Sequence, residues 1–65
     1  MEIIETTKSS ATLKLSRQEL VIFNNAMNEI CNGIDVFEFD TRIGATKDEV
    51  RLLLAQVHDL IDRIR

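Results

Sequence analysis

Two short polar motifs divide this chain into segments and predict where its helices begin. SRQE at residues 16–19 and TKDE at 46–49 each place a hydroxyl residue three positions before a glutamate. In such a capping box the hydroxyl accepts a free backbone N–H of the first helical turn, while the glutamate accepts the N–H of the cap residue. We therefore expect one helix to begin after Ser16 and a second helix to begin after Thr46.

Apolar residues at helical spacing follow both motifs and define the sides on which the two helices should pack. The stripe after the first motif consists of Leu20, Phe23, Met27, Ile30 and Cys31. The stripe after the second consists of Val50, Leu53, Leu54, Val57, Leu60, Ile61 and Ile64. Asn32-Gly33 is a typical helix stop, so the first helix should span about residues 17–32.

Residues 1–15 have strand character, because β-branched and apolar residues alternate with polar ones around Ser9-Ser10. A turn at these serines places Glu5 opposite Lys14 and Thr7 opposite Thr12, which are favourable cross-strand pairs. On the other side it pairs Ile4 with Leu15, Thr6 with Leu13 and Lys8 with Ala11. A longer loop, or one strand alone, is the alternative. The predicted fold is α+β: a single domain, residues 1–65, with an N-terminal β-strand or hairpin followed by two amphipathic α-helices joined by an irregular connector.

The connector IDVFEFDTRIGA, residues 34–45, contains two of the three phenylalanines of the chain. Phe37 and Phe39 alternate with charged residues, a period-two pattern that would place both rings on one side of an extended segment. We expect the two rings to close the end of the helix pair. Arg42 would then pair with Glu38, Asp40 or Glu29. A short helical turn after Asp35 is the competing interpretation.

Asn24, Asn28 and Asn32 recur every four residues, with Asn25 beside them, and form a ridge along the first predicted helix. Asparagine costs roughly 0.6 kcal/mol relative to alanine in a helix interior. Either the amides bind the backbone of residues 34–45, which is the structural interpretation, or they form a recognition strip. The candidate partner-binding surface combines Asn24, Asn25, Asn28, Glu29, Glu38, Asp40 and Arg42.

The sequence contains no recognisable catalytic or cofactor-binding pattern. Cys31 is the only cysteine and His58 the only histidine, so neither a disulfide, a zinc ligand set nor a nucleophile–base pair can be argued. The two glycines form no phosphate-binding loop. We therefore expect a non-enzyme without a metal or cofactor, with Cys31 inside the helix stripe and His58 at the surface.

Size and charge favour a protein partner. A 65-residue domain buries only roughly 60% of its unfolded surface, and no disulfide or metal stabilises this one. Val21, Ile22 and Leu52 fall outside the two stripes, which favours coverage by another chain, most simply a homodimer. The net charge of -3 favours a basic partner over nucleic acid or anionic lipid. The expected function is protein interaction, for example as an acidic regulator or an immunity-type inhibitor of a basic protein.

The expected location is the cytoplasm. The first residues carry two glutamates and no long apolar run, so they do not read as a secretory signal or a membrane span. A lone thiol is compatible with a reducing compartment.

The alternative function is a dimeric DNA-binding regulator. ATLKLSRQEL followed later by IGATKDEV resembles a stretched ribbon-helix-helix pattern, and RIGATKDEVRLLL resembles the turn and second helix of a helix-turn-helix. Against this, the predicted strands offer only Lys8 and Lys14 as basic groups. Asp48 and Glu49 would face the phosphates at the start of the reading helix.

Residues 15–50, LSRQELVIFNNAMNEICNGIDVFEFDTRIGATKDEV, resemble a group of short bacterial proteins with no assigned activity. The resemblance rests on NNAMNEICNG and EFDTRIG. It implies a small bacterial protein of uncharacterised function, and no site residue is carried over from it.

Overall fold

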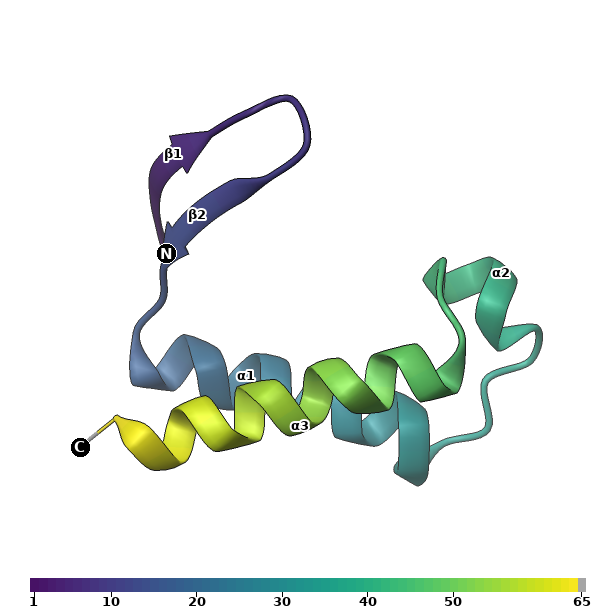
Figure 1. Cartoon of the computed structure of the whole chain (residues 1–65). Helices are drawn as coiled ribbons and strands as arrows, with labels where there is room; N and C mark the ends of the chain where they lie inside the picture. Colours follow the sequence, from purple (N-terminus) through teal and green to yellow (C-terminus); the bar gives the residue numbers. More distant parts are fainter. Residues whose placement is uncertain (65) are drawn as a thin grey trace.

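The computed structural model describes residues 1–64, and a hairpin followed by helices confirms the α+β class. Two antiparallel helices lie side by side, the hairpin projects from one end of this pair, and a short third helix lies at the other end (Figure 1). The elements are β1 (Glu2–Thr6), β2 (Ala11–Lys14), α1 (Arg17–Asn28), a π-helical turn (Glu29–Gly33), α2 (Phe39–Ile43) and α3 (Lys47–Arg63).

Both capping boxes form as the sequence predicts. The Ser16 hydroxyl accepts the backbone N–H of Glu19 at 3.1 Å, and the Glu19 carboxylate accepts the N–H of Ser16 at 2.9 Å. Thr46 and Glu49 exchange the same two bonds at 3.1 and 3.0 Å. These bonds satisfy backbone donors that a helix start otherwise leaves free, so α1 and α3 begin one residue after each cap.

The core is small and lies toward the α2 end of the helix pair. Cys31, Phe39 and Val50 form a buried cluster, and Leu20 is buried separately nearer the hairpin. Half-buried apolar side chains surround this cluster: Met27, Ile30, Val36 and Ala45. The burial of Cys31 confirms the prediction for its place in the stripe.

Helix α1 continues beyond Asn28 into a wider turn. The backbone N–H of Ile34 donates to the carbonyl of Glu29 at 2.9 Å, five residues back instead of four. This π-helical turn runs to Gly33, so the helical segment predicted for about residues 17–32 is confirmed to within a residue. After it the chain leaves the helix pair in extended conformation at Ile34.

The hairpin exists, but the predicted register is wrong. Its two-residue loop is Lys8-Ser9, because Thr7 N–H donates to the Ser10 carbonyl at 2.8 Å and the Thr7 hydroxyl accepts the Ser10 N–H at 3.0 Å. An irregularity at Ile4 in β1 then shifts the register by one further residue. The observed cross-strand pairs are Glu2 with Lys14, Ile3 with Leu13, Glu5 with Thr12, and Thr6 with Ala11.

The connector is helical in part, which corrects the extended segment that the alternation predicted. Glu38 adopts a left-handed conformation, φ 53°, and directly precedes α2. This change of direction separates the two rings: Phe39 is 7% exposed and packs in the core, whereas Phe37 is 74% exposed. The competing interpretation, a short helical turn, is the correct one, although the helix begins later than Asp35 suggested. Gly44, φ 86°, ends α2.

The expected ion pairs of Arg42 do not form. Within residues 1–64 its guanidinium contacts neither Glu38, Asp40 nor Glu29 at ion-pair distance. The cation at this end that meets an aromatic ring is Lys47, whose Nζ lies 5.7 Å from the centre of the Phe39 ring.

The molecule is a thin slab, with extents of 34 × 32 × 16 Å. Its radius of gyration is 13.1 Å, against roughly 11 Å for a compact chain of this length. None of the helices that the structure describes is long and apolar enough to cross a membrane.

Candidate functional site

The two sides of the helix pair differ in chemistry, and this difference defines the candidate site. On α1, Asn24 and Asn28 line a groove together with Arg51, Ala55 and His58 of α3. Residues three or four apart share one side of a helix, so the opposite flank of each helix must lie on the other side of the helix pair. That flank carries large apolar side chains: Phe23 and Met27 on α1, Ile30 on the π-helical turn, and Leu53, Val57 and Leu60 on α3. We call these six residues the apolar face.

The apolar face is substantially open to solvent. Phe23 is 43% exposed, Leu53 52% and Leu60 44%, although the sequence stripes placed all three in the core. In addition, Ile22 and Leu52 are exposed on other sides of their helices, as predicted, whereas Val21 is half-buried. Exposed large apolar side chains that gather on one side of a small protein typically mark an interaction surface.

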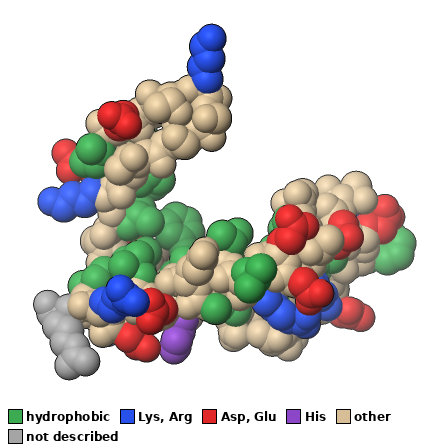
Figure 2. Space-filling view, viewed as in Figure 1, with side chains coloured by type: hydrophobic (Ala, Val, Ile, Leu, Met, Phe, Trp, Pro, Cys, Tyr) green, Lys and Arg blue, Asp and Glu red, His purple; other side chains and the backbone are tan. Residues whose placement is uncertain are grey.

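The hairpin extends this exposed apolar surface. Every residue of both strands is solvent-exposed, including Ile3, Ile4 and Leu13. Hydrophobic side chains gather where the hairpin meets the helix pair, and they continue along the side of the pair that faces the space between the hairpin and α2 (Figure 2). The helix pair therefore has a concave apolar side, bounded by the hairpin at one end and α2 at the other (Figure 2).

The accessible surface is correspondingly large. The chain exposes 5331 Å², whereas a compact monomer of 7.4 kDa exposes roughly 4,200 Å², an excess of roughly 1,100 Å². An average stable protein interface buries about 800 Å² on each partner. The excess is thus of the size that one interface would remove.

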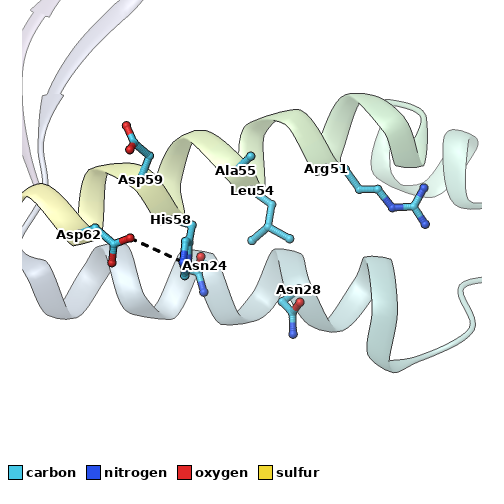
Figure 3. Close-up of a pocket in the computed structure, with 8 residues that line it drawn as sticks. All are labelled: Asn24, Asn28, Arg51, Leu54, Ala55, His58, Asp59 and Asp62. Atoms are coloured by element: carbon cyan, nitrogen blue, oxygen red, sulfur yellow. Dashed lines mark ion pairs between the residues drawn. The ribbon is translucent and has the colours of Figure 1, made fainter.

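The opposite side of the helix pair contains a groove of about 640 Å³, in which polar and charged side chains surround an apolar floor (Figure 3). Its lining consists of Asn24, Asn28, Arg51, Leu54, Ala55, His58, Asp59 and Asp62. Arg51, Ala55, His58 and Asp62 follow one another at spacings of four, three and four, so a single flank of α3 supplies most of the wall.

Charges along α3 are largely paired with one another. Arg51 donates to Asp48 at 3.1 Å, Arg63 donates to Asp59 at 3.0 Å, and His58 Nε2 lies 3.8 Å from Asp62. The exposed position of His58 confirms the prediction for this residue. Exposed pairs of this kind contribute little to stability.

The asparagine ridge bonds within itself, which corrects its structural interpretation. Asn32 donates to the Asn28 side chain at 3.0 Å, and Asn24 donates to Asn25 at 3.4 Å. In the described part of the chain no amide of the ridge binds the backbone of residues 34–45. Asn24 is unusual, because its Oδ1 is buried at the helix seam without a hydrogen-bond partner. A buried unpaired acceptor costs about 1–3 kcal/mol.

The predicted partner-binding residues fall into two separate groups. Asn24 and Asn28 line the groove, with Asn25 and Glu29 exposed on the same helical segment. Glu38, Asp40 and Arg42 are exposed at α2, at the far end of the helix pair (Figure 1).

Sequence reasoning missed the α3 wall of the groove. The regular spacing of Arg51, Ala55, His58 and Asp62 was the available signal for it. The sequence stripes also placed the exposed Phe23, Leu53 and Leu60 in the core. Periodicity identifies the apolar side of a helix but does not show whether another element covers that side.

Two glutamates have a shifted pKa, and both belong to capping boxes. A hydrogen bond from the N-terminal ammonium, followed by the Ser16 backbone bond, lowers the pKa of Glu19. The Thr46 backbone bond lowers the pKa of Glu49. Both shifts reflect helix capping. Among residues 1–64 no group of three or more histidine, cysteine or acidic side chains is arranged to hold a metal ion.

No protein-family model matches this chain, and neither the curated proteins nor the solved structures contain a match to it. The resemblance to short bacterial proteins therefore stays a prediction.

Proposed function

We propose that this chain is a non-enzymatic protein-interaction module that forms a homodimer through its apolar face. The observation that carries the proposal is the exposed apolar side of the helix pair. Domains are normally built from at least two packed layers of secondary structure, and this helix pair is a single layer. A second copy would supply the missing layer.

The excess accessible surface area supports a second copy as the partner. The excess of roughly 1,100 Å² per chain exceeds the roughly 800 Å² that an average stable interface takes from each partner. A two-fold symmetric contact also requires one surface to be complementary to itself, and a face of aliphatic and aromatic side chains along the helix pair satisfies that condition. The side of the helix pair that carries the groove then stays free for a different partner.

That different partner is a basic protein, and the module acts on it as an acidic cytoplasmic regulator or immunity-type inhibitor. The net charge of -3 and the exposed Glu38 and Asp40 support this proposal. Loss of co-purification of a basic protein after Glu38→Lys with Asp40→Lys, at an unchanged helical circular dichroism spectrum, would support the α2 end as the binding surface. Retained co-purification would remove it.

The dimer is tested by sedimentation velocity over a concentration series. We expect the mass of two chains for the parent protein and of one chain for Leu53→Glu with Leu60→Glu. Leu52→Glu is the matched control, since Leu52 is 69% exposed and lies outside the apolar face. A parent protein that remains monomeric at high concentration, or equal effects of the two changes, would contradict the proposal.

DNA binding is the second candidate, and the arrangement of α2, a turn at Gly44 and α3 favours it. The acidic first turn of α3, Asp48 and Glu49, opposes contact with phosphates. The hairpin also pairs its two strands within one chain, unlike a ribbon shared between two subunits. Tight, salt-sensitive binding to duplex DNA that is lost with Lys14→Ala would favour this candidate over protein recognition.

A further inference from the structure

The hairpin is the part of the molecule that its own chain covers least. In residues 1–64 its one hydrogen-bonded link to the helices joins the N-terminal ammonium to the Glu19 carboxylate. All residues of β1 and β2 are exposed on both sides of the two-stranded sheet. A two-stranded hairpin is only marginally stable in water unless one of its sides packs against another element. The hairpin therefore requires cover that its own helices do not provide.

The register shows which side requires that cover. Residues directly opposite each other in an antiparallel pair project to the same side of the sheet. One side therefore carries Ile3 with Leu13 and Thr6 with Ala11, and the other carries Glu2 with Lys14 and Glu5 with Thr12. The predicted register would have placed Leu13 beside Thr6, so the apolar pair is visible only in the structure. Ile3 is 67% exposed and Leu13 44%.

We propose that the hairpin is a clasp that packs its Ile3–Leu13 side against the apolar face of a second copy of this chain. This inference rests on the proposed homodimer and goes further, because it assigns each hairpin to the other subunit. The contact joins Ile3 and Leu13 of one copy to the Leu53 region of its partner copy. Both surfaces are aliphatic and both are open in the single chain.

The shape of the slab supports a second copy as the occupant. The hairpin and α2 stand at opposite ends of the helix pair, with the apolar side between them (Figures 1 and 2). A second helix pair laid face to face fits between these two ends. A two-fold axis that crosses the helices then places each hairpin at the α2 end of the other copy, where Leu53 lies near the start of α3.

The area also fits this occupant. The surface by which this chain exceeds a compact monomer is sufficient for one standard interface per chain, and both the helix face and the hairpin expose large apolar side chains. The reciprocal clasp buries both regions at once. A contact through the helices alone would leave the Ile3–Leu13 side in water.

The first test compares two sides of the hairpin by dimer affinity. Ile3→Ser with Leu13→Ser should raise the dimer dissociation constant by at least about tenfold, because two aliphatic side chains lose their cover. Glu5→Ser with Thr12→Ser changes the opposite side of the hairpin and should alter the dimer dissociation constant less than about threefold. An unchanged constant in the first variant would overturn the clasp and leave the dimer standing. A parent protein without any dimer would instead remove the proposed function.

A second test does not depend on hairpin stability. In a Cys31→Ser background, a chain with Leu13→Cys is mixed with a longer, tagged chain with Leu53→Cys and oxidised. We expect the disulfide-linked pair of unequal chains to form readily. Thr12→Cys, on the charged side of β2, should give little of this product. Equal yields from residues 12 and 13 would overturn the clasp.

Discussion

The two ends of the helix pair show how differently one short chain can treat its apolar residues. At the α2 end the chain folds back, and Phe39 joins Cys31 and Val50 in a closed core. At the hairpin end the chain extends outward, and Ile3 and Leu13 stay in water. Composition does not distinguish the two ends. The difference is that a connector packs back onto the helix pair at one end, whereas within residues 1–64 no segment covers the strands at the other end.

The largest expected effect separates a buried ring from an exposed one at the closed end. Phe39→Ala should lower the free energy of unfolding by about 3–4 kcal/mol, because it leaves a cavity in a small core. Phe37→Ala should change it by less than about 0.5 kcal/mol. Urea titrations followed by circular dichroism measure both. Similar losses in the two variants would contradict the burial of Phe39 and the exposure of Phe37.

The contact between α1 and α3, which connects the two ends, gives the next largest expected effect on stability. Asn24→Leu should raise the free energy of unfolding by about 1–2 kcal/mol, since it removes a buried acceptor without a partner. Asn25→Leu, at an exposed position of the same helix, serves as the control and should have little effect. A lower stability for Asn24→Leu would show that the amide forms a bond that matters to the fold.

Backbone conformation at the closed end predicts a pair of opposite effects. Glu38 is the only residue other than glycine with a positive φ in the described chain, and Glu38→Gly should stabilise the protein by about 0.5–1 kcal/mol. Gly44→Ala should destabilise it by about 1 kcal/mol, because φ 86° disfavours a β-carbon. Thermal unfolding measures both. Effects of the same sign would contradict the left-handed assignment of one position.

The smallest effect compares the capping boxes, one at each end. The pKa of Glu19 and of Glu49 is lowered in the folded state, so each contributes stability at neutral pH that disappears as the pH falls below about 4. Glu19→Gln and Glu49→Gln should therefore be less stable than the parent at pH 7, with a gap that narrows at pH 3. The urea midpoints of parent and variants at the two pH values measure this stability difference. A difference that is the same at pH 7 and pH 3 would contradict a contribution from the lowered pKa values.

Local patterns predicted the helix starts, and long-range geometry explains the errors. A capping box and an apolar stripe involve residues within a turn or two of one another, so Ser16, Thr46 and the extent of α1 could be read directly. The hairpin register depended on the Thr7 hydroxyl and on an extra residue at Ile4, which alternation alone does not reveal. Likewise, only the left-handed backbone at Glu38 separates Phe37 from Phe39.

The candidate site was predictable in smaller part. The ridge of Asn24 and Asn28 is a local feature of one helix, so its place on a polar side followed from spacing. The residues that face this ridge across the groove come from α3. Predicting them requires knowing which side of each helix packs against the other helix. The exposure of the apolar face could not be predicted for the same reason. Phe23 and Leu53 belong to the same stripes as residues that are buried in the structure.

The π-helical turn of residues 29–33 governs the direction in which the chain departs from α1. A regular helix advances about 100° per residue, so deleting a single residue there would swing the exit point by roughly that angle. Residues 34–38 would then leave the helical turn in a different direction, and Phe39 would no longer pack beside Cys31. The closed end thus depends on one additional residue in the helical turn, and the length of this turn tolerates less variation than the exposed residues Glu29, Asn32 and Gly33 suggest.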